Sequence, residues 1–134
     1  MTGDLFAGVA EAQSSREVMA EGAMLLRGFT LARQDQLLAA LREVIAVAPF
    51  RHMVTPGGFT MSVAMTNCGK VGWVTDRRGY RYDVNDPESG QPWPAMPPVL
   101  LQLAHDAAEA GGFKNFVPDA CLINRYVPGA KMSL

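Results

Sequence analysis

The stretch TPGGFTMSVAMTNCGKVGWVTDRRGYRYD, Thr55 to Asp83, decides the fold because it reads as short β-strands separated by turns. Its PGG at 56–58 is a turn signal, and FTMSVAMTN then alternates between apolar and small polar side chains. The alternation predicts a half-polar strand, which NCGKVG interrupts. One face of this strand carries Phe59, Met61, Val63 and Met65.

The second half of the stretch predicts a β-hairpin. GWVT and YRYD flank DRRG, a four-residue loop at 76–79. If the two flanks pair, Thr75 faces Tyr80 and Trp73 faces Tyr82. Because side chains alternate along a strand, the three aromatic rings then share one face of the hairpin.

This hairpin is locally basic, although the formal net charge of the chain is -1. Aromatic rings interleaved with cations suit a single-stranded or flipped-out base, since rings stack on the base while cations meet phosphates. A solvated hairpin with a cross-strand aromatic pair is the alternative interpretation. Against the single acid Asp76, residues 70–82 carry the cations Lys70, Arg77, Arg78 and Arg81.

The segment before this stretch predicts a strand and a helix. Ala23 to Phe29 is short, apolar and closed by Gly28, which suits a strand. Thr30 could cap a helix that Pro49 ends. The apolar stripe of that helix consists of Leu37, Leu38, Leu41, Val44, Ile45 and Ala48.

The segment after it predicts an irregular connection and a second helix. Asp86 to Pro98 holds five of the nine prolines, and Trp93 and Met96 offer it anchors. The helix begins near Pro97, and Gly111-Gly112 supplies a stop. Its stripe consists of Leu100, Leu103, Ala104 and Ala107.

The last predicted strand, ACLINRY, spans Ala120 to Tyr126. Alternation places Leu122, Asn124 and Tyr126 on one face, with Arg125 on the other. An amide and a phenol on an apolar face could hold a small polar ligand. Buried polar groups satisfied by neighbouring strands are an equally open interpretation.

Composition bounds the remaining possibilities. A chain of 134 residues with 49% hydrophobic side chains suits one domain, 1–134. Cys68 and Cys121 have no CxxC spacing and are interpreted as free thiols in a reducing cytoplasm. His52 and His105 are interpreted as ordinary surface or cap residues rather than metal ligands. We expect a cytoplasmic protein, because no export signal or membrane span is visible.

Several long strings of this sequence resemble the AlkB family, the Fe(II)- and 2-oxoglutarate-dependent dioxygenases that remove alkyl groups from nucleic-acid bases. The strings are PFRHMVTPGGFTMSVAMTNCGKVGW, the YRY after the hairpin loop, QPWPAMP and PDACLINRYVPGAKMSL. They cover nearly everything from Pro49 to Leu134, and the strand and helix before Pro49 match more weakly.

The resemblance implies an α+β, mainly β fold, namely a double-stranded β-helix, or jelly roll, with N-terminal helices and a mobile β-rich lid. In this chain, 23–48 would be the N-terminal strand and helix, and 49–85 the nucleotide-recognition lid. The connection, second helix and first core strands would occupy 86–134.

The resemblance also implies roles for particular residues. Trp73 would stack near the damaged base, and Tyr80 would contact the nucleotide backbone. The implied substrate-binding set is Thr55, Met61, Met65, Trp73, Tyr80, Arg81, Tyr82, Lys131 and Ser133, with Met61 and Met65 as an adaptable floor. The implied 2-oxoglutarate set is Leu122, Asn124, Arg125 and Tyr126, with Arg125 pointing the other way.

One departure from the family concerns iron. The His-x-Asp motif is expected just after Leu134, and His52 and His105 cannot build a 2-His-1-carboxylate site. We therefore expect no metal ligand or catalytic residue in this chain, which resembles the N-terminal portion of such an enzyme. Its core would be incomplete, and the chain alone would be inactive.

The function implied is repair of N-alkylated bases in single-stranded DNA, with RNA as an alternative substrate. Fe(II) and 2-oxoglutarate would be the cofactors, and succinate, carbon dioxide and an aldehyde the products. We expect no membrane partner, and a monomer for the complete protein. The alternatives are a non-catalytic module that binds single-stranded nucleic acid and an inactive structural fragment.

Overall fold

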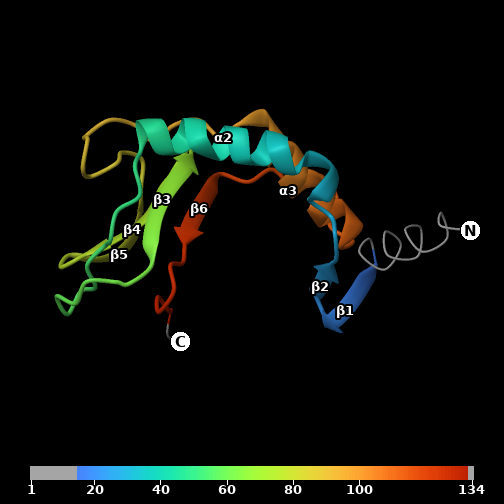
Figure 1. Ribbon diagram of the computed structural model, residues 1–134, viewed down its shortest axis with the longest axis horizontal. Helices are drawn as coiled ribbons and strands as arrows, with labels where there is room; N and C mark the ends of the chain where they lie inside the picture. Colours follow the sequence, from blue (N-terminus) through green and yellow to red (C-terminus); the bar gives the residue numbers. More distant parts are fainter. Residues whose placement is uncertain (1–14, 133–134) are drawn as a thin grey trace, which may run out of the picture.

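The computed structural model describes residues 15–132, which form an arch (Figure 1). Two helices run along its top, one pair of strands lies at one end, and two pairs lie at the other. In chain order the elements are β1 (Arg16–Ala20), β2 (Ala23–Leu26), η1 (Leu31–Arg33), α2 (Gln34–Val47), β3 (Ala64–Gly69), β4 (Gly72–Asp76), β5 (Gly79–Asp83), α3 (Pro98–Ala110) and β6 (Ala120–Arg125).

The strands of residues 15–132 form three antiparallel pairs, β1–β2, β3–β6 and β4–β5. In the central pair, residues 64–69 meet residues 125–120, so segments distant in the sequence lie side by side. On the other edge of β3, Arg51 and Met65 exchange two backbone hydrogen bonds of 3.0 and 2.8 Å, and the Gly69 N–H donates a 2.9 Å bond to the Pro94 carbonyl. This mixture of helices and strands agrees with the α+β class.

Two apolar clusters cover the two faces of the β3–β6 pair. On one face, Met65 and Val63 pack with the side chains of Ala48, Met53, Val74 and Trp93. On the other face, Cys68 packs with Val44 of α2 and Met96. Trp93 and Met96 are both buried, which confirms that they anchor the proline-rich connection.

Gly72 allows Trp93 to approach the backbone of β4. A Cβ atom at Gly72 would lie 2.5 Å from the Trp93 ring, closer than real contacts allow. The indole Nε1 of Trp93 donates a 3.0 Å hydrogen bond to the Asp83 carbonyl at the end of β5. The connection is therefore tied to both strands of the β4–β5 hairpin.

The predicted strand from Phe59 was wrong in its boundaries. β3 begins at Ala64 and continues through NCG to Gly69, because β6 provides a partner for each of its residues. Residues 59–63 form only an isolated bridge, between Thr60 and Val54, and Phe59 is exposed. The four-residue hairpin loop was also wrong, since Asp76 pairs with Gly79 across a two-residue turn.

The N-terminal elements differ from the prediction in detail. The predicted strand ends at Leu26 rather than Phe29, and it pairs with β1, which the sequence did not predict. All five residues of β1 are exposed, so no apolar alternation marked it. The first helix opens with the 3-10 turn η1, and Thr30 makes no side-chain capping bond. In α2 the buried face includes Ala40, while Leu38 is exposed.

The second helix agrees closely with its prediction. It spans Pro98–Ala110, with proline in its first turn, and Gly112 follows it at φ +95°. None of the helices within 15–132 is long and apolar enough to cross a bilayer.

Candidate functional site

The β4–β5 hairpin presents an open aromatic face. Its register pairs Trp73 with Tyr82 and Thr75 with Tyr80, which confirms the predicted shared face. The Trp73 and Tyr80 rings stack, with centroids 5.7 Å apart and planes 24° from parallel. Tyr80 and Tyr82 are 62% and 66% exposed, whereas Trp73 is half-buried. The predicted cross-strand aromatic packing is therefore present, and a broad ring surface still faces solvent.

Asn67 holds Trp73 in position. The Asn67 side chain, which is fully buried, donates to the Trp73 carbonyl and accepts from the Trp73 backbone N–H, both at 2.9 Å. These two bonds fix the first half of β4 to β3. This role of Asn67 was not predicted from the sequence, because an asparagine in NCGKVG was interpreted as a break in the strand.

Arg81, which was assigned to the substrate, is held by an acid of its own hairpin. Its two terminal nitrogens each lie 3.0 Å from a carboxylate oxygen of Asp76. The bond from Arg81, together with one from the Arg78 backbone N–H, holds the pKa of Asp76 well below its usual range. This two-point ion pair braces the hairpin, and the substrate role of Arg81 stays a prediction.

Arg77, which the predicted substrate-binding set does not include, is the cation of the hairpin turn that has no partner among residues 15–132. It lies at the hairpin turn, with its guanidinium against Gly58 of the PGG turn. Within residues 15–132 it makes no ion pair and no hydrogen bond. Thr55 closes the adjoining turn by accepting a 3.1 Å bond from the Phe59 N–H, so a hydroxyl and an unpaired guanidinium adjoin there. Sequence position alone could not distinguish Arg77 from Arg78 or Arg81.

The outer face of β6 confirms the predicted alternation. Leu122, Asn124 and Tyr126 are all exposed, whereas Cys121 and Ile123, which alternate with them, pack against the second apolar cluster. Met65 pairs with Asn124 across the two strands and is fully buried. The first apolar cluster therefore covers β3 on this face of the sheet and leaves Asn124 of β6 exposed. Arg125 lies on the other face, with its guanidinium 4.4 Å from the centre of the Phe50 ring, and does not join the set.

A hollow connects the aromatic face with the face of β6. Its volume is about 380 Å³, and Tyr82 and Ala120 both line it. Tyr82 belongs to the aromatic face, and Ala120 shares its side of β6 with Asn124 by alternation. Tyr82 at one side of the aromatic face thus adjoins the first residue of β6, whereas Asn124 and Tyr126 do not line this hollow.

The remaining predicted substrate residues occupy different environments. Met61 is half-buried beside the first apolar cluster, whereas Met65 is completely buried within it. Lys131 is exposed, and its backbone N–H and carbonyl bond the Ser62 hydroxyl at 3.1 and 3.0 Å. Ser133 lies outside the described residues.

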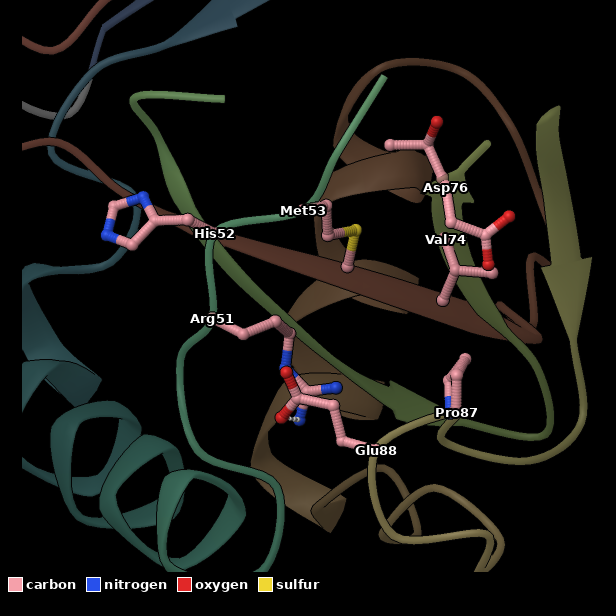
Figure 2. Close-up of a pocket in the computed structure, with 8 residues that line it drawn as sticks. Arg51, His52, Met53, Val74, Asp76, Pro87 and Glu88 are labelled. Atoms are coloured by element: carbon pink, nitrogen blue, oxygen red, sulfur yellow. Dashed lines mark ion pairs between the residues drawn. The ribbon is translucent and has the colours of Figure 1, made fainter. Parts of the chain in front are cut away.

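A separate cavity of about 160 Å³ lies behind the hairpin (Figure 2). Its charged lining residues are already paired, Arg51 with Asp86 and Glu88, and Asp76 with Arg81. Figure 2 shows Arg51 beside Glu88, and the His52 ring pointing away from Val74 and Asp76. The cavity therefore lies between loops and strand β4, and the charges of its lining residues are balanced by ion pairs.

The described residues do not provide an iron site of the expected kind. Within 15–132, one group of metal-ligating side chains comes together, with ligand atoms within 4.8 Å: His105, Asp106 and Glu109 of α3. This group has a single histidine, and Asp106 already accepts bonds from Arg33 at 2.9 Å and Gln102 at 2.8 Å. It does not match a 2-His-1-carboxylate site, and His52 lies elsewhere, bonded to the Met61 carbonyl.

Comparison with known proteins gives a consistent result. The model of the 2OG-Fe(II) oxygenase superfamily matches residues 22–134. The chain is 53% identical over 131 residues to a protein of Escherichia coli named alpha-ketoglutarate-dependent dioxygenase AlkB. It is 54% identical over 131 residues to the protein of the same name from Salmonella typhimurium. A homologue from Caulobacter vibrioides is 44% identical over 104 residues.

The matched lengths are unequal. The Escherichia coli and Salmonella alignments each cover 98% of this chain and 59% of the relative. The Caulobacter alignment covers 78% of this chain and 46% of the relative. The chain thus spans between about half and three fifths of the length of the curated relatives it matches.

Proposed function

The chain belongs to the 2OG-Fe(II) oxygenase superfamily, as a member of the AlkB family, and from this premise we propose that the whole protein removes alkyl groups from nucleic-acid bases by oxidation. The proposed substrate is single-stranded DNA with N-alkylated bases, and RNA is the alternative. Fe(II) and 2-oxoglutarate would supply the oxidising chemistry, with succinate, carbon dioxide and an aldehyde as products. The protein's own contribution is to bind and orient the reactants.

The aromatic face of the hairpin is the observation that carries the proposal for this chain. Trp73, Tyr80 and Tyr82 share it, and the unpaired Arg77 lies at its tip. Stacking on rings accepts any base, and a cationic alkylated base also gains from the electron-rich ring face. Asn67 and the Arg81–Asp76 pair hold this face rigid before the nucleotide arrives.

The neighbouring face of β6 supports a place for 2-oxoglutarate. Asn124 and Tyr126 offer an amide and a phenol hydroxyl, which can donate hydrogen bonds to carboxylate or keto oxygens. Leu122 adds an apolar wall on the same side. The described residues of this face include no cation, so Asn124 and Tyr126 would orient the cosubstrate rather than neutralise it.

Replacing Asn124 with alanine in the whole protein should raise the 2-oxoglutarate concentration needed for half-maximal turnover by about 10- to 150-fold. A hydrogen bond to a charged group is worth about 1.5–3 kcal/mol, and its loss accounts for this range. Succinate release at varied 2-oxoglutarate measures it. Arg125→Gln is the matched control on the opposite face of β6, and it should leave the requirement near that of wild type. An unchanged requirement in Asn124→Ala would remove this residue from the pocket.

Replacing Arg77 with glutamine should flatten the salt dependence of binding to single-stranded DNA. Each phosphate that a cation neutralises contributes about 0.7 to the slope of log affinity against log salt, so the slope should fall by about 0.7. Fluorescence anisotropy at four salt concentrations gives the slope. Arg27→Gln is the control, because Arg27 lies on the connection after β2 and already pairs with Glu17 at 2.8 Å. Equal slopes for Arg77→Gln and wild type would refute the phosphate contact.

A nucleic-acid-binding module without chemistry is the second candidate function. It rests on the same aromatic face, because rings can stack on a base without any metal. The two candidates separate in the same binding assay followed by a turnover assay. Salt-dependent binding without succinate release from the whole protein would favour the module.

A further inference from the structure

Cys68 and Cys121 face each other across β3 and β6. The antiparallel register pairs them directly, so both side chains project from the same face of the strand pair. Both are free thiols. They pack together in the second apolar cluster, beneath Leu100 and Leu101 of α3. Two thiols far apart in the sequence thus meet at one point of the fold.

The backbone at this point suits a disulfide. Directly opposed residues of an antiparallel pair have Cα atoms about 4.5–5.5 Å apart. Disulfides bridge Cα separations of about 4.4–6.8 Å, so the strands can keep their register. The Cβ atoms of opposed residues are about 4.5–5.5 Å apart and those of disulfides about 3.5–4.5 Å. Met65 and Gly69 direct their backbone bonds away from β6, so Cys68 and Cys121 form a hydrogen-bonded pair, the wider kind, with Cα atoms about 5.5 Å apart. Closing the bond therefore requires the Cβ atoms to approach by about 1–2 Å, through a local change in strand twist.

The two thiols differ in access and in acidity. Cys68 has no exposed surface, whereas Cys121 is only partly buried, so a small reagent reaches Cys121 first. A hydrogen bond with the Cys68 thiol lowers the pKa of Cys121, against the opposing effect of burial. The same contact, together with burial, raises the pKa of Cys68. Cys121 therefore carries the thiolate, which is the reactive form.

We propose that Cys68 and Cys121 are a redox-sensitive pair, in which a hydroperoxide oxidises Cys121 and Cys68 then resolves it as a disulfide between β3 and β6. In the first step the Cys121 thiolate attacks one oxygen of hydrogen peroxide and the O–O bond breaks. Cys121 becomes a sulfenic acid, and the departing hydroxide takes up a proton to form water.

In the second step the Cys68 sulfur attacks the sulfenic sulfur of Cys121. The S–S bond forms, the S–O bond breaks, and the leaving hydroxide combines with the Cys68 proton to give a second water. In total, two thiols and one hydrogen peroxide become one disulfide and two waters. A dithiol reductant reverses the change.

The disulfide would lie on the strands that carry the proposed cosubstrate residues. Cys121 is three residues from Asn124 on β6, and Cys68 is three residues from Met65, which pairs with Asn124. Oxidation would therefore tie the two strands together next to the proposed pocket. The inference rests on the register of β3 and β6 and on the different access of the two thiols, so it stands or falls independently of the proposed function.

The test is to treat the native chain with hydrogen peroxide, remove the oxidant, alkylate the remaining thiols under denaturing conditions and analyse the peptides by mass spectrometry. We expect the two cysteine peptides as one linked species that is lighter by two hydrogen atoms, and that dithiothreitol separates. In Cys68→Ser, dimedone should capture a sulfenic acid on Cys121. In Cys121→Ser, Cys68 should remain an alkylatable thiol.

Two results would overturn the inference. One is that both thiols of the oxidised wild type stay alkylatable, or that they oxidise further without any linked species. The other is that linkage is as fast in denaturant as in native buffer, because the fold should accelerate it at least about tenfold by holding the thiols together. Circular dichroism of each variant shows that the comparison is made on folded protein.

Discussion

Replacing Asp86 with alanine is expected to lower the free energy of unfolding by about 3–5 kcal/mol, because it leaves the buried charge of Arg51 with only the longer, 3.7 Å contact to the exposed Glu88. The Arg51 and Asp86 side chains are only 8% and 4% exposed. Two bonds of 2.6 and 2.8 Å join the guanidinium to the carboxylate. Arg51 also lies over the Trp93 ring, 5.2 Å from its centre, so the pair links the loop before β3 to the proline-rich connection.

Urea denaturation followed by circular dichroism measures this loss. The control is Glu17→Ala, which removes the exposed ion pair with Arg27 and should cost less than about 1 kcal/mol. If Asp86→Ala were as stable as the control, the buried Arg51–Asp86 pair would not contribute to stability as its geometry indicates.

The same carboxylate makes stability depend on pH. Burial alone would raise the pKa of Asp86, but the bonds from Arg51 and from the Glu88 backbone N–H outweigh it and lower this pKa. The stability that the carboxylate contributes is therefore fully present above its unfolded pKa of about 3.9, and it is lost as pH falls through the lower folded value. In Asp86→Ala, the free energy of unfolding should no longer show the decrease at low pH that protonation of this carboxylate causes.

Replacing Trp73 with alanine should weaken binding to a single-stranded oligonucleotide with one methylated base by about 5- to 150-fold. Stacking of one base on an aromatic ring is worth about 1–3 kcal/mol, which converts to that range. Trp73 is the member of the aromatic face whose backbone Asn67 fixes to β3, and its ring is half-buried, so it offers the most rigid platform.

Two further variants keep this result interpretable. Trp73→Leu retains apolar bulk against the core while it removes the stacking plane, so it should lose affinity as Trp73→Ala does. Phe113→Ala removes an exposed aromatic ring beyond the end of α3 and should bind like wild type. Retention of wild-type affinity in both Trp73 variants would eliminate the stacking role.

The parts of the site that the sequence predicted correctly depend on local geometry. Side chains alternate along any strand, so the shared face of Trp73, Tyr80 and Tyr82 follows once the hairpin pairs. The same alternation separates Asn124 from Arg125 on β6. The boundaries of α3 also follow from local signals, a proline at its start and a glycine pair at its end.

The parts that escaped prediction depend on contacts between distant segments. The pairing of β3 with β6 extends β3 through NCG, and it brings Cys68 to Cys121. Arg81 and Arg77 have the same chemistry, and only the position of Asp76 in the folded hairpin shows which of them is paired. The alternation of side chains along a sequence does not determine which strands pair, in which register, or which charged groups meet.

The most direct test of a nucleotide-binding aromatic face is photocrosslinking. A single-stranded oligonucleotide carrying iodouracil is irradiated with the chain, and the crosslinked residue is identified by mass spectrometry. We predict that the crosslink maps to Trp73, Tyr80 or Tyr82, and that excess unlabelled oligonucleotide suppresses it. Crosslinks confined to other segments, such as α3, or none above the unirradiated control would contradict the account.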